Sequence, residues 1–528
     1  MDNNNSSHLE QLQTLIDRAA AHLQGDLDVE QIELYDLAFS LADVCAARAL
    51  TRLAEVSDQS VLHNLAAFFV ADTTANVLNR LAARPRNYGF QAEGIPSLGA
   101  FSQYLESGFV SELGKAILES DLPEQPLEES QRIIRNTFRE FANDVVVPLA
   151  EDIHRNDLIV PNEILERLRE MGCFGLSVPE RFGGLKPDGH EDSVGMIIVT
   201  EELSRGSLGA AGSLITRPEI MARAILEGGT PEQQQRWLPG IATGDPLCAI
   251  SVTEPNTGSD VASVSLRATP TEGGWLLNGG KTWCTFAGKA GHILVLARTE
   301  SDASPPHRGL SLFVVDKPVQ EGRDIEVAQN SGGKMTGRAI ATLGYRGMHS
   351  FEMFYDDFFV PNENLIGEEG GRGRGFYYTM RGFMGGRLQT AARACGLMQA
   401  AFEDSVRYAT DRRVFGKPVI EHPLSLAKIV KMAAVITACR AFTHEVAALM
   451  DRGEGATEAS LVKLIACRAA EWVTREAVQM HGGMGYAEET SVSRYFVDAR
   501  VLSIFEGAEE TLAIRVVGKS LVDQQKAS

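Results

Sequence analysis

Apolar residues recur at helical spacing from residue 9 to residue 85, in a stretch rich in Ala, Leu, Glu and Gln. Side chains three and four positions apart lie on the same face of a helix, so this spacing predicts amphipathic helices. One predicted face consists of Leu34, Leu37, Ala38, Leu41 and Cys45. We expect two or three helices in this stretch.

A second helical pattern starts near Glu128 and continues, with loops, to about residue 246. Prolines and glycines between residues 85 and 99 separate it from the first pattern, because both residue types interrupt helices. Residues 175–190 are rich in Gly and Pro and are expected to form a loop.

From about residue 248 the sequence no longer shows helical spacing and instead consists of short runs of β-branched and apolar residues separated by Gly, Pro, Asn and Asp. This alternation of strand-forming and turn-forming residues predicts a sheet or barrel. The predicted strands are Leu247–Val252, Gly274–Leu277, His292–Ala297, Leu310–Val315, Ala339–Leu343 and Ser350–Phe354.

Helical spacing returns after P-N-E-N (361–364), with long amphipathic segments at 386–410, 424–451 and 457–481 that suit a helical bundle. The expected fold class is α+β and mostly helical. Four regions are expected: an N-terminal helical extension (1–125), a helical domain (126–246), a β-domain (247–365) and a C-terminal helical bundle (366–528).

Composition narrows the possible classes of protein. With 528 residues the chain is too long for one hydrophobic core, so several packed units are expected. Seventy acidic against 50 basic residues give a net charge of −20, which opposes binding to nucleic acid. No long uncharged apolar stretch predicts a membrane span, and the polar start M-D-N-N-N-S-S-H does not resemble a secretory signal. We therefore expect a cytoplasmic location.

The seven cysteines are scattered without a C-x-x-C pair, which argues against a disulfide framework and against a zinc site. We expect them to be reduced packing residues, and we expect no metal site.

Two stretches of the predicted β-domain carry candidate chemistry. A-I-S-V-T-E-P-N-T-G-S-D-V-A-S (249–263) is a strand that runs into a turn rich in hydroxyls, which can bind a polar ring edge or a phosphate; an ordinary strand end is the alternative. In N-G-G-K-T-W-C-T-F-A (278–287), Trp283 and Thr285 would alternate onto one strand face and flank a flat heterocycle. A tryptophan on a core face is, however, more often simple packing.

Two further stretches lie in the predicted bundle. Y-A-T-D-R-R-V-F-G-K-P-V-I-E-H-P-L (408–424) offers arginines, whose planar fork suits pyrophosphate, although arginines on a helix are usually solvated. Gln479 precedes G-G-M-G (482–485), whose backbone can meet a nucleotide or simply end a helix. Glu506-Gly507 then follows an apolar run and offers a carboxylate for general-base work, or a surface carboxylate.

In order and content these four stretches resemble the acyl-CoA dehydrogenase family of flavoproteins, over about residues 128–520. The resemblance implies an N-terminal helical domain, a middle β-domain, a C-terminal four-helix bundle and FAD as cofactor. It implies that FAD contacts Val252, Thr253, Ser259, Trp283, Thr285, Arg412, Phe415, Gln479, Gly482 and Gly483.

The roles within this set also follow from the resemblance. Ser259 would lie near the acyl-CoA as well, and Thr285 near the reactive N5 of the flavin. Arg412 and Phe415, in the family's R-x-x-F-G, and the Gln479 segment would meet the FAD of a neighbouring subunit. A homo-oligomer, at least a dimer, is therefore implied. Two departures, Ala508 for a frequent Thr and Pro423 for a common Gln, put single contacts in doubt.

By the same resemblance, Glu506 removes the α-proton of the thioester while the β-hydrogen passes as hydride to flavin N5. The backbone N–H of Glu506 would bind the thioester carbonyl, and Gly507 would allow the substrate to approach. Some relatives place the base directly before an arginine that here is Arg387, but that position is Gly386. Glu506 is then the candidate that the motif supports.

A closer resemblance concerns the substrate. The long N-terminal extension, together with residues 273–287, 343–348 and 387–394, implies (2S)-methylsuccinyl-CoA, a short branched thioester that would be oxidised to mesaconyl-C1-CoA in the ethylmalonyl-CoA pathway. Its free carboxylate requires a cationic or strong donor group. Arg217, Arg381 and Arg387 are the candidates.

The expected electron acceptor is an electron-transfer flavoprotein. The alternatives are a dehydrogenase of another short or branched acyl-CoA, an acyl-CoA oxidase that uses O2, and a non-catalytic relative that binds flavin or nucleic acid. The acidic charge opposes the last of these. Residues 1–125 could cover an assembly surface or cap the substrate entrance, and the sequence does not choose between these roles.

Overall fold

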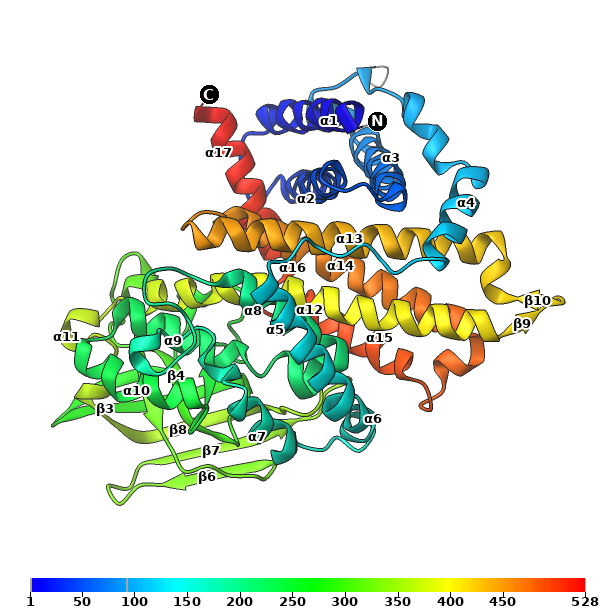
Figure 1. Ribbon diagram of the computed structural model, residues 1–528. Helices are drawn as coiled ribbons and strands as arrows, with labels where there is room; N and C mark the ends of the chain where they lie inside the picture. The colour runs from blue at the N-terminus through cyan, green and yellow to red at the C-terminus, as the bar shows by residue number, and fades with distance from the viewer. Residues whose placement is uncertain (1, 92–93, 528) are drawn as a thin grey trace. The chain divides into compact units, whose positions relative to one another are not determined.

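The computed structural model describes residues 2–91 and 94–527 of the chain (Figure 1). The chain divides into two compact units. The first unit combines both ends of the chain, Met1–Thr137 and Thr390–Ser528, and the second unit is Phe138–Gln389. Each unit is described below by itself.

The first unit begins with the helical extension. The predicted helical stretch forms three helices, α1 (Asp2–His22), α2 (Gln31–Glu55) and α3 (Ser60–Ala83), which confirms the expectation. Leu34, Leu37 and Ala38 are buried as predicted, whereas Leu41 and Cys45 are half-buried. A fourth helix, α4 (Ser107–Leu118), lies between the two helical patterns, within the predicted extension of residues 1–125.

Helix α3 is long and apolar enough to cross a membrane by length and composition alone. Within the protein, however, 67% of its apolar window is buried, as in the core helix of a folded unit. It packs against α2 and against α13 (Pro423–Asp451). The apolar character of α3 is therefore accounted for by packing.

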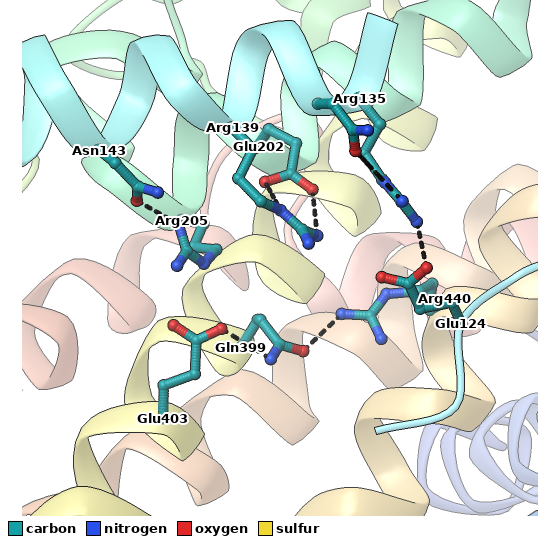
Figure 2. Close-up of polar contacts among 10 residues, drawn as sticks. Glu124, Arg135, Arg139, Asn143, Glu202, Arg205, Gln399, Glu403 and Arg440 are labelled. Atoms are coloured by element: carbon teal, nitrogen blue, oxygen red, sulfur yellow. Dashed lines mark hydrogen bonds and ion pairs between the residues drawn. The ribbon is translucent and has the colours of Figure 1, made fainter. Parts of the chain in front are cut away.

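The C-terminal helices complete the first unit. They are α13, α14 (Ala456–His481), α15 (Ser491–Leu502), α16 (Glu509–Thr511), the π-helical η13 (Leu512–Gly518) and α17 (Lys519–Ala527), together with the part of α12 (Gly375–Asp411) from residue 390. Both α2 and α3 pack against α13 (Figure 1). Ion pairs join the ends of the chain, among them Arg52 with Glu445 at 2.5 Å and Lys431 with Asp72 at 3.0 Å. In the same unit, Arg440 donates to Gln399 at 2.8 Å and thereby ties α13 to α12 (Figure 2).

The helices of the second unit are the end of α5 (Glu129–Phe141), α6 (Val147–Arg155), α7 (Asn162–Glu170), α8 (Ser193–Gly206), α9 (Thr216–Gly228), α10 (Pro231–Thr243), α11 (Glu368–Gly371) and the start of α12. A capping box formed by Thr230 and Gln233 defines the start of α10. Arg139 donates two hydrogen bonds to the buried Glu202, and Arg205 donates to Asn143 (Figure 2). These contacts hold the end of α5 and the segment that follows it against α8.

An eight-stranded sheet forms the rest of the second unit, in the order β1-β4-β2-β3-β8-β7-β6, with β5 paired to β4. The strands are β1 (Leu247–Ser251), β2 (Arg267–Thr271), β3 (Gly274–Thr285), β4 (Ala290–Arg298), β5 (Leu310–Asp316), β6 (Asp324–Ala328), β7 (Lys334–Ile340) and β8 (Ser350–Pro361). Ile293 and Val295 of β4 belong to an apolar core made by side chains of the strands, while Leu294 and Leu296, on the other face, belong to a core shared with α9 and α10. Burial on both faces explains why this strand is apolar throughout.

Each of the six predicted strands has a counterpart in the sheet, but the sheet has eight strands, and several predicted bounds are wrong. β3 and β8 continue well past the predicted ends, and β7 begins at Lys334 instead of Ala339 and ends at Ile340. β2 and β6 were missed, because their polar, half-exposed sequences R-A-T-P-T and D-I-E-V-A lack an apolar run. Residues 175–190 form turns and one short 3-10 helix, Glu180–Phe182, as expected of a loop.

Candidate functional site

Two of the predicted motifs meet in the second unit. Where β1 ends, Thr253 accepts a hydrogen bond from the backbone N–H of Thr282 at 2.9 Å, and Val252 accepts one from Lys281 Nζ at 2.8 Å. Val252 is buried and Thr253 is half-buried. The bridge between Glu254 and Thr257 then closes the predicted turn, after which Ser259 is exposed. The structure thus places Val252 and Thr253 directly beside the Trp283 segment.

A buried ion pair that sequence reasoning missed supports this junction. Lys281 Nζ lies 2.9 Å from Glu254 Oε1, and both residues are buried. Glu254 also accepts hydrogen bonds from the backbone N–H groups of Ser265 and Leu266 at 2.9 and 2.7 Å. Burial lowers the pKa of Lys281 to about 8, against the attraction of Glu254. The only sequence signal for this ion pair was a lysine within a strand of mostly apolar and small residues.

Trp283 and Thr285 do not alternate as the sequence analysis predicted. The register of β3 against β8 shifts between Lys281 and Cys284, and Trp283 has a left-handed φ of 57°. Trp283 is 55% exposed, whereas Thr285 is buried and shares a hydrogen bond with Ser350 at 2.9 Å. The same-face prediction is therefore wrong, because a β-bulge breaks the period of two.

Three of the candidate residues have a strained backbone. A left-handed φ is rare for residues other than glycine and costs of order 1–3 kcal/mol. Trp283, Phe415 and Glu506 all have one, at 57°, 50° and 54°. Such conformations are kept where the surrounding structure imposes them, and they cluster at functional sites.

Arg217 on α9 is buried, at 6% exposure. One of its terminal nitrogens donates to the Ser213 carbonyl at 2.8 Å and to the Tyr345 hydroxyl at 3.2 Å. Within residues 2–91 and 94–527, no carboxylate forms an ion pair with Arg217. A buried charge without a counter-ion is costly, so this guanidinium is suited to an anionic ligand.

The loop that carries Tyr345 is held close to Arg217 by packing. Tyr345 has a φ of 57° and is 8% exposed. A Cβ placed on Gly209 would lie 2.3 Å from the Arg346 carbonyl, so only glycine permits this approach. Sequence reasoning noted the loop but assigned no role to Tyr345.

The other two candidate arginines differ from Arg217. Arg381 is largely exposed and its Nε lies 4.0 Å from Glu227, which is a surface pairing. Arg387 is half-buried on α12, next to the buried Gly386. Of the three arginines, Arg217 is the one that is buried.

In the first unit Glu506 lies in a short loop between α15 and α16. The backbone N–H of Glu509 donates to the Ser503 carbonyl at 3.1 Å and closes this loop. Glu506 is half-buried, and its Oε2 is buried without a hydrogen-bond partner in the described chain. An unpartnered buried carboxylate oxygen is free to accept a proton.

Two buried cations flank the residues on either side of Glu506. Lys463 Nζ donates to the Gly507 carbonyl at 2.6 Å, and the Arg393 guanidinium lies 4.8 Å from the centre of the Phe505 ring. Lys463 and Arg393 are both fully buried. Sequence reasoning missed both, because each lies on a helix far from the motif.

Arg412 and Phe415 lie in a β-hairpin, β9 (Arg413–Val414) and β10 (Lys417–Pro418), that joins α12 to α13. Phe415 and Gly416, the two turn residues, have φ values of 50° and 84°, as a type I′ turn requires. Phe415 is 98% exposed and Arg412 is exposed. The turn therefore presents an aromatic ring with almost no packing from its own chain.

Gln479, Gly482 and Gly483 lie at the end of α14 and are exposed. A Cβ on Gly482 or Gly483 would meet nothing within 4 Å, so internal packing does not require these glycines. Gly482 has φ 58° and ψ −133°, a conformation that is essentially restricted to glycine. The exposed backbone here could approach a ligand or a second subunit closely.

Comparison with known proteins is consistent with this arrangement. The chain matches the N-terminal domain model of acyl-CoA dehydrogenases over residues 128–245, the middle domain model over 249–358 and the C-terminal domain model over 373–522. It is 43% identical over 398 residues to (2S)-methylsuccinyl-CoA dehydrogenase of Cereibacter sphaeroides, a match that covers 75% of this chain and 70% of the relative.

Two solved structures are similar as well. Butyryl-CoA dehydrogenase from Megasphaera elsdenii has a TM-score of 0.68 at 28% identity, covering 76% of this chain and 100% of that one. A chain from work on the electron transferring flavoprotein of Acidaminococcus fermentans has a TM-score of 0.67 at 29% identity, covering 75% and 98%.

Proposed function

The chain belongs to the acyl-CoA dehydrogenase family, a family of FAD-dependent oxidoreductases, and we propose that it dehydrogenates (2S)-methylsuccinyl-CoA to mesaconyl-C1-CoA with Glu506 as the base. The fold is that of the family, a helical domain, a curled sheet and a helical bundle. The observation that carries the proposal is the buried, unpartnered Oε2 of Glu506 in a strained loop.

The residues of the predicted motifs fit FAD. In the second unit, Val252, Thr253, Trp283 and Thr285 would hold the flavin ring. In the first unit, the open backbone at Gly482 and Gly483 would admit the dinucleotide of a neighbouring subunit's FAD. Bound FAD would supply the hydride acceptor. The 55% exposure of Trp283 supports this assignment, because a large aromatic ring in a strained conformation has little reason to face water unless it stacks on a ligand.

Glu506 would accept the α-proton of the thioester on Oε2. Its backbone N–H makes no hydrogen bond to the described residues and would donate to the thioester carbonyl, stabilising the developing negative charge. Binding of the acyl group would exclude water from this carboxylate and strengthen both interactions. The links from Lys463 to Gly507 and from Arg393 to Phe505 would keep the base in one orientation.

Arg217 would bind the free carboxylate of the methylsuccinyl group. Its burial without a carboxylate partner among the described residues supports this role, because the substrate would supply the missing charge. The Tyr345 hydroxyl would orient the guanidinium by accepting one of its hydrogens. Ser259 would contact the acyl-CoA from its exposed turn.

We infer a homo-oligomer of at least two subunits and an electron-transfer flavoprotein as acceptor. The nearly fully exposed Phe415 supports a second subunit, since its ring would otherwise face water. The similarity to a chain studied with an electron transferring flavoprotein supports the acceptor. Peroxide release during turnover, measured against reduction of a flavoprotein or dye, separates this assignment from an oxidase.

The test is anaerobic mixing of the purified yellow protein with acyl-CoA thioesters while the flavin absorbance is followed. Methylsuccinyl-CoA should bleach the flavin faster than 2-methylbutyryl-CoA does. Glu506→Gln should retain FAD but lose bleaching by at least about 10³-fold. Glu510→Gln, which removes an exposed charge from the same segment, should bleach at the wild-type rate. Near-normal bleaching by Glu506→Gln would end the assignment of the base.

A further inference from the structure

A polar cluster joins the N-terminal extension to the segment that follows Glu506. Glu509 begins α16, and its Oε1 accepts hydrogen bonds from the Tyr35 hydroxyl of α2 and from Arg468 Nη2 of α14, the latter at 2.7 Å. The backbone N–H of the same Glu509 closes the Glu506 loop on Ser503. One residue therefore both closes the loop and binds the extension.

The rings of α2 hold Arg468 in this cluster. The Arg468 guanidinium lies 3.4 Å from the centre of the Phe39 ring and 5.3 Å from that of Tyr35. Arg468 also donates to the Tyr35 hydroxyl. Burial and the hydrogen bond to Glu509 raise the pKa of Tyr35 to about 12, so its hydroxyl stays a donor at any physiological pH. The cluster is thus a fixed arrangement of donors around one carboxylate.

The extension contacts the chain after Glu509 as well. A Cβ on Gly518 would lie 2.9 Å from Leu34 Cβ, so the end of η13 lies directly against α2. Arg515 of η13 pairs with Asp28 at 2.5 Å, just before α2 begins. Helix α2 therefore lies along the continuation of the Glu506 segment, and the family domain models, which begin at residue 128, do not cover it.

We propose that α2 positions the catalytic loop, with Tyr35 acting as a positioning residue for Glu506 through the carboxylate of Glu509. The inference rests on the proposed function. The Tyr35 hydroxyl and Arg468 fix Glu509, Glu509 fixes the closure at Ser503, and the closure sets the strained backbone of Glu506. A base displaced by about 1 Å loses much of its rate, so this anchoring affects the chemical step more than binding.

The test compares two variants that each remove one hydroxyl from the extension. Tyr35→Phe keeps the ring on Arg468 but removes the donor to Glu509. Tyr88→Phe is the matched control, because buried Tyr88 bonds a carboxylate, Asp36, at 3.3 Å within the extension and does not contact the loop.

The first readout is hydrogen exchange of the peptide that contains residues 503–512, followed by mass spectrometry in the FAD-loaded protein. Tyr35→Phe should speed its exchange about tenfold by favouring local opening, and Tyr88→Phe should leave it unchanged. Unchanged exchange in Tyr35→Phe would overturn the proposal. This readout needs no substrate, so it stands even if the proposed reaction fails.

The second readout is the rate of flavin bleaching at saturating acyl-CoA. Tyr35→Phe should slow bleaching about tenfold, while the concentration for half-maximal rate and the FAD content stay within about twofold. Adding Tyr35→Phe to Glu509→Gln should cause no further loss, because both act through the same contact. Faster exchange with an unchanged bleaching rate, or additive losses in the double variant, would refute positioning. A wild-type protein that no acyl-CoA bleaches would instead refute the proposed function.

Discussion

Arg217→Met should change substrate preference while leaving stability nearly intact. Arg217 is buried, bonds only the Ser213 carbonyl and the Tyr345 hydroxyl, and pairs with no carboxylate in residues 2–91 and 94–527. Methionine fills a similar volume and leaves no buried carboxylate behind. Replacement of a buried charge by an apolar residue is often neutral, so the free energy of unfolding should change by less than about 1 kcal/mol.

The expected fall in kcat/KM follows from the hydrogen bond between Arg217 and the substrate carboxylate that the variant removes. A hydrogen bond between charged groups contributes about 1.5–3 kcal/mol, which corresponds to about 10- to 150-fold in kcat/KM. Arg217→Met should therefore lower kcat/KM for methylsuccinyl-CoA by this factor, with little effect on 2-methylbutyryl-CoA, which lacks the carboxylate. The assay is the ratio of the two kcat/KM values with a dye acceptor.

Arg223→Met on the same helix provides the control. Arg223 pairs with buried Glu219 at 2.8 Å and with Glu191 at 3.1 Å, so its loss removes a buried ion pair from Glu219 and one of the two ion pairs of Glu191, which keeps Lys186. This variant should unfold more easily by about 3–5 kcal/mol. If Arg217→Met destabilises the protein as much, or leaves the substrate ratio unaltered, Arg217 is a structural residue and the assignment fails.

Two further outcomes are expected. Burial lowers the pKa of Lys281 from 10.5 to about 8, so between pH 8 and pH 10.5 the unfolded chain binds more protons than the native protein, and this group makes the free energy of unfolding rise with pH. Urea unfolding at several pH values should show this rise in the wild type and not in Lys281→Met. Parallel dependence on pH in the two proteins would contradict the prediction. Phe415→Ser removes the almost fully exposed ring that is proposed to contact a second subunit, so sedimentation should shift toward the monomer and the FAD content should fall, while the helical circular dichroism signal stays unchanged. An unchanged dimer with full FAD content would contradict this role of the hairpin.

The sequence predicted what depends on local pattern and failed where distant segments decide. Periodicity predicted two or three N-terminal helices, and the family resemblance assigned residues 252–253 and the 278–287 stretch to the same cofactor. The exposure of Trp283 depends on a register shift against β8, which spacing within one strand does not reveal. In the described residues Arg217 has no carboxylate partner and Glu506 Oε2 has no hydrogen-bond donor. Both facts depend on how distant segments pack, which local sequence does not reveal. The Tyr35 cluster joins residues more than 430 positions apart, beyond any local signal.

The first unit is made from the two ends of the chain, and this order has a consequence during synthesis. Helix α3, apolar along its length, leaves the ribosome long before its partner α13 (Pro423–Asp451) is made. The second unit, Phe138–Gln389, is continuous in sequence and can fold in the interval. The nascent extension must therefore be kept from aggregating or from entering a membrane until the last fifth of the protein arrives, and incomplete chains should be degraded with their N-terminal helices still unpaired.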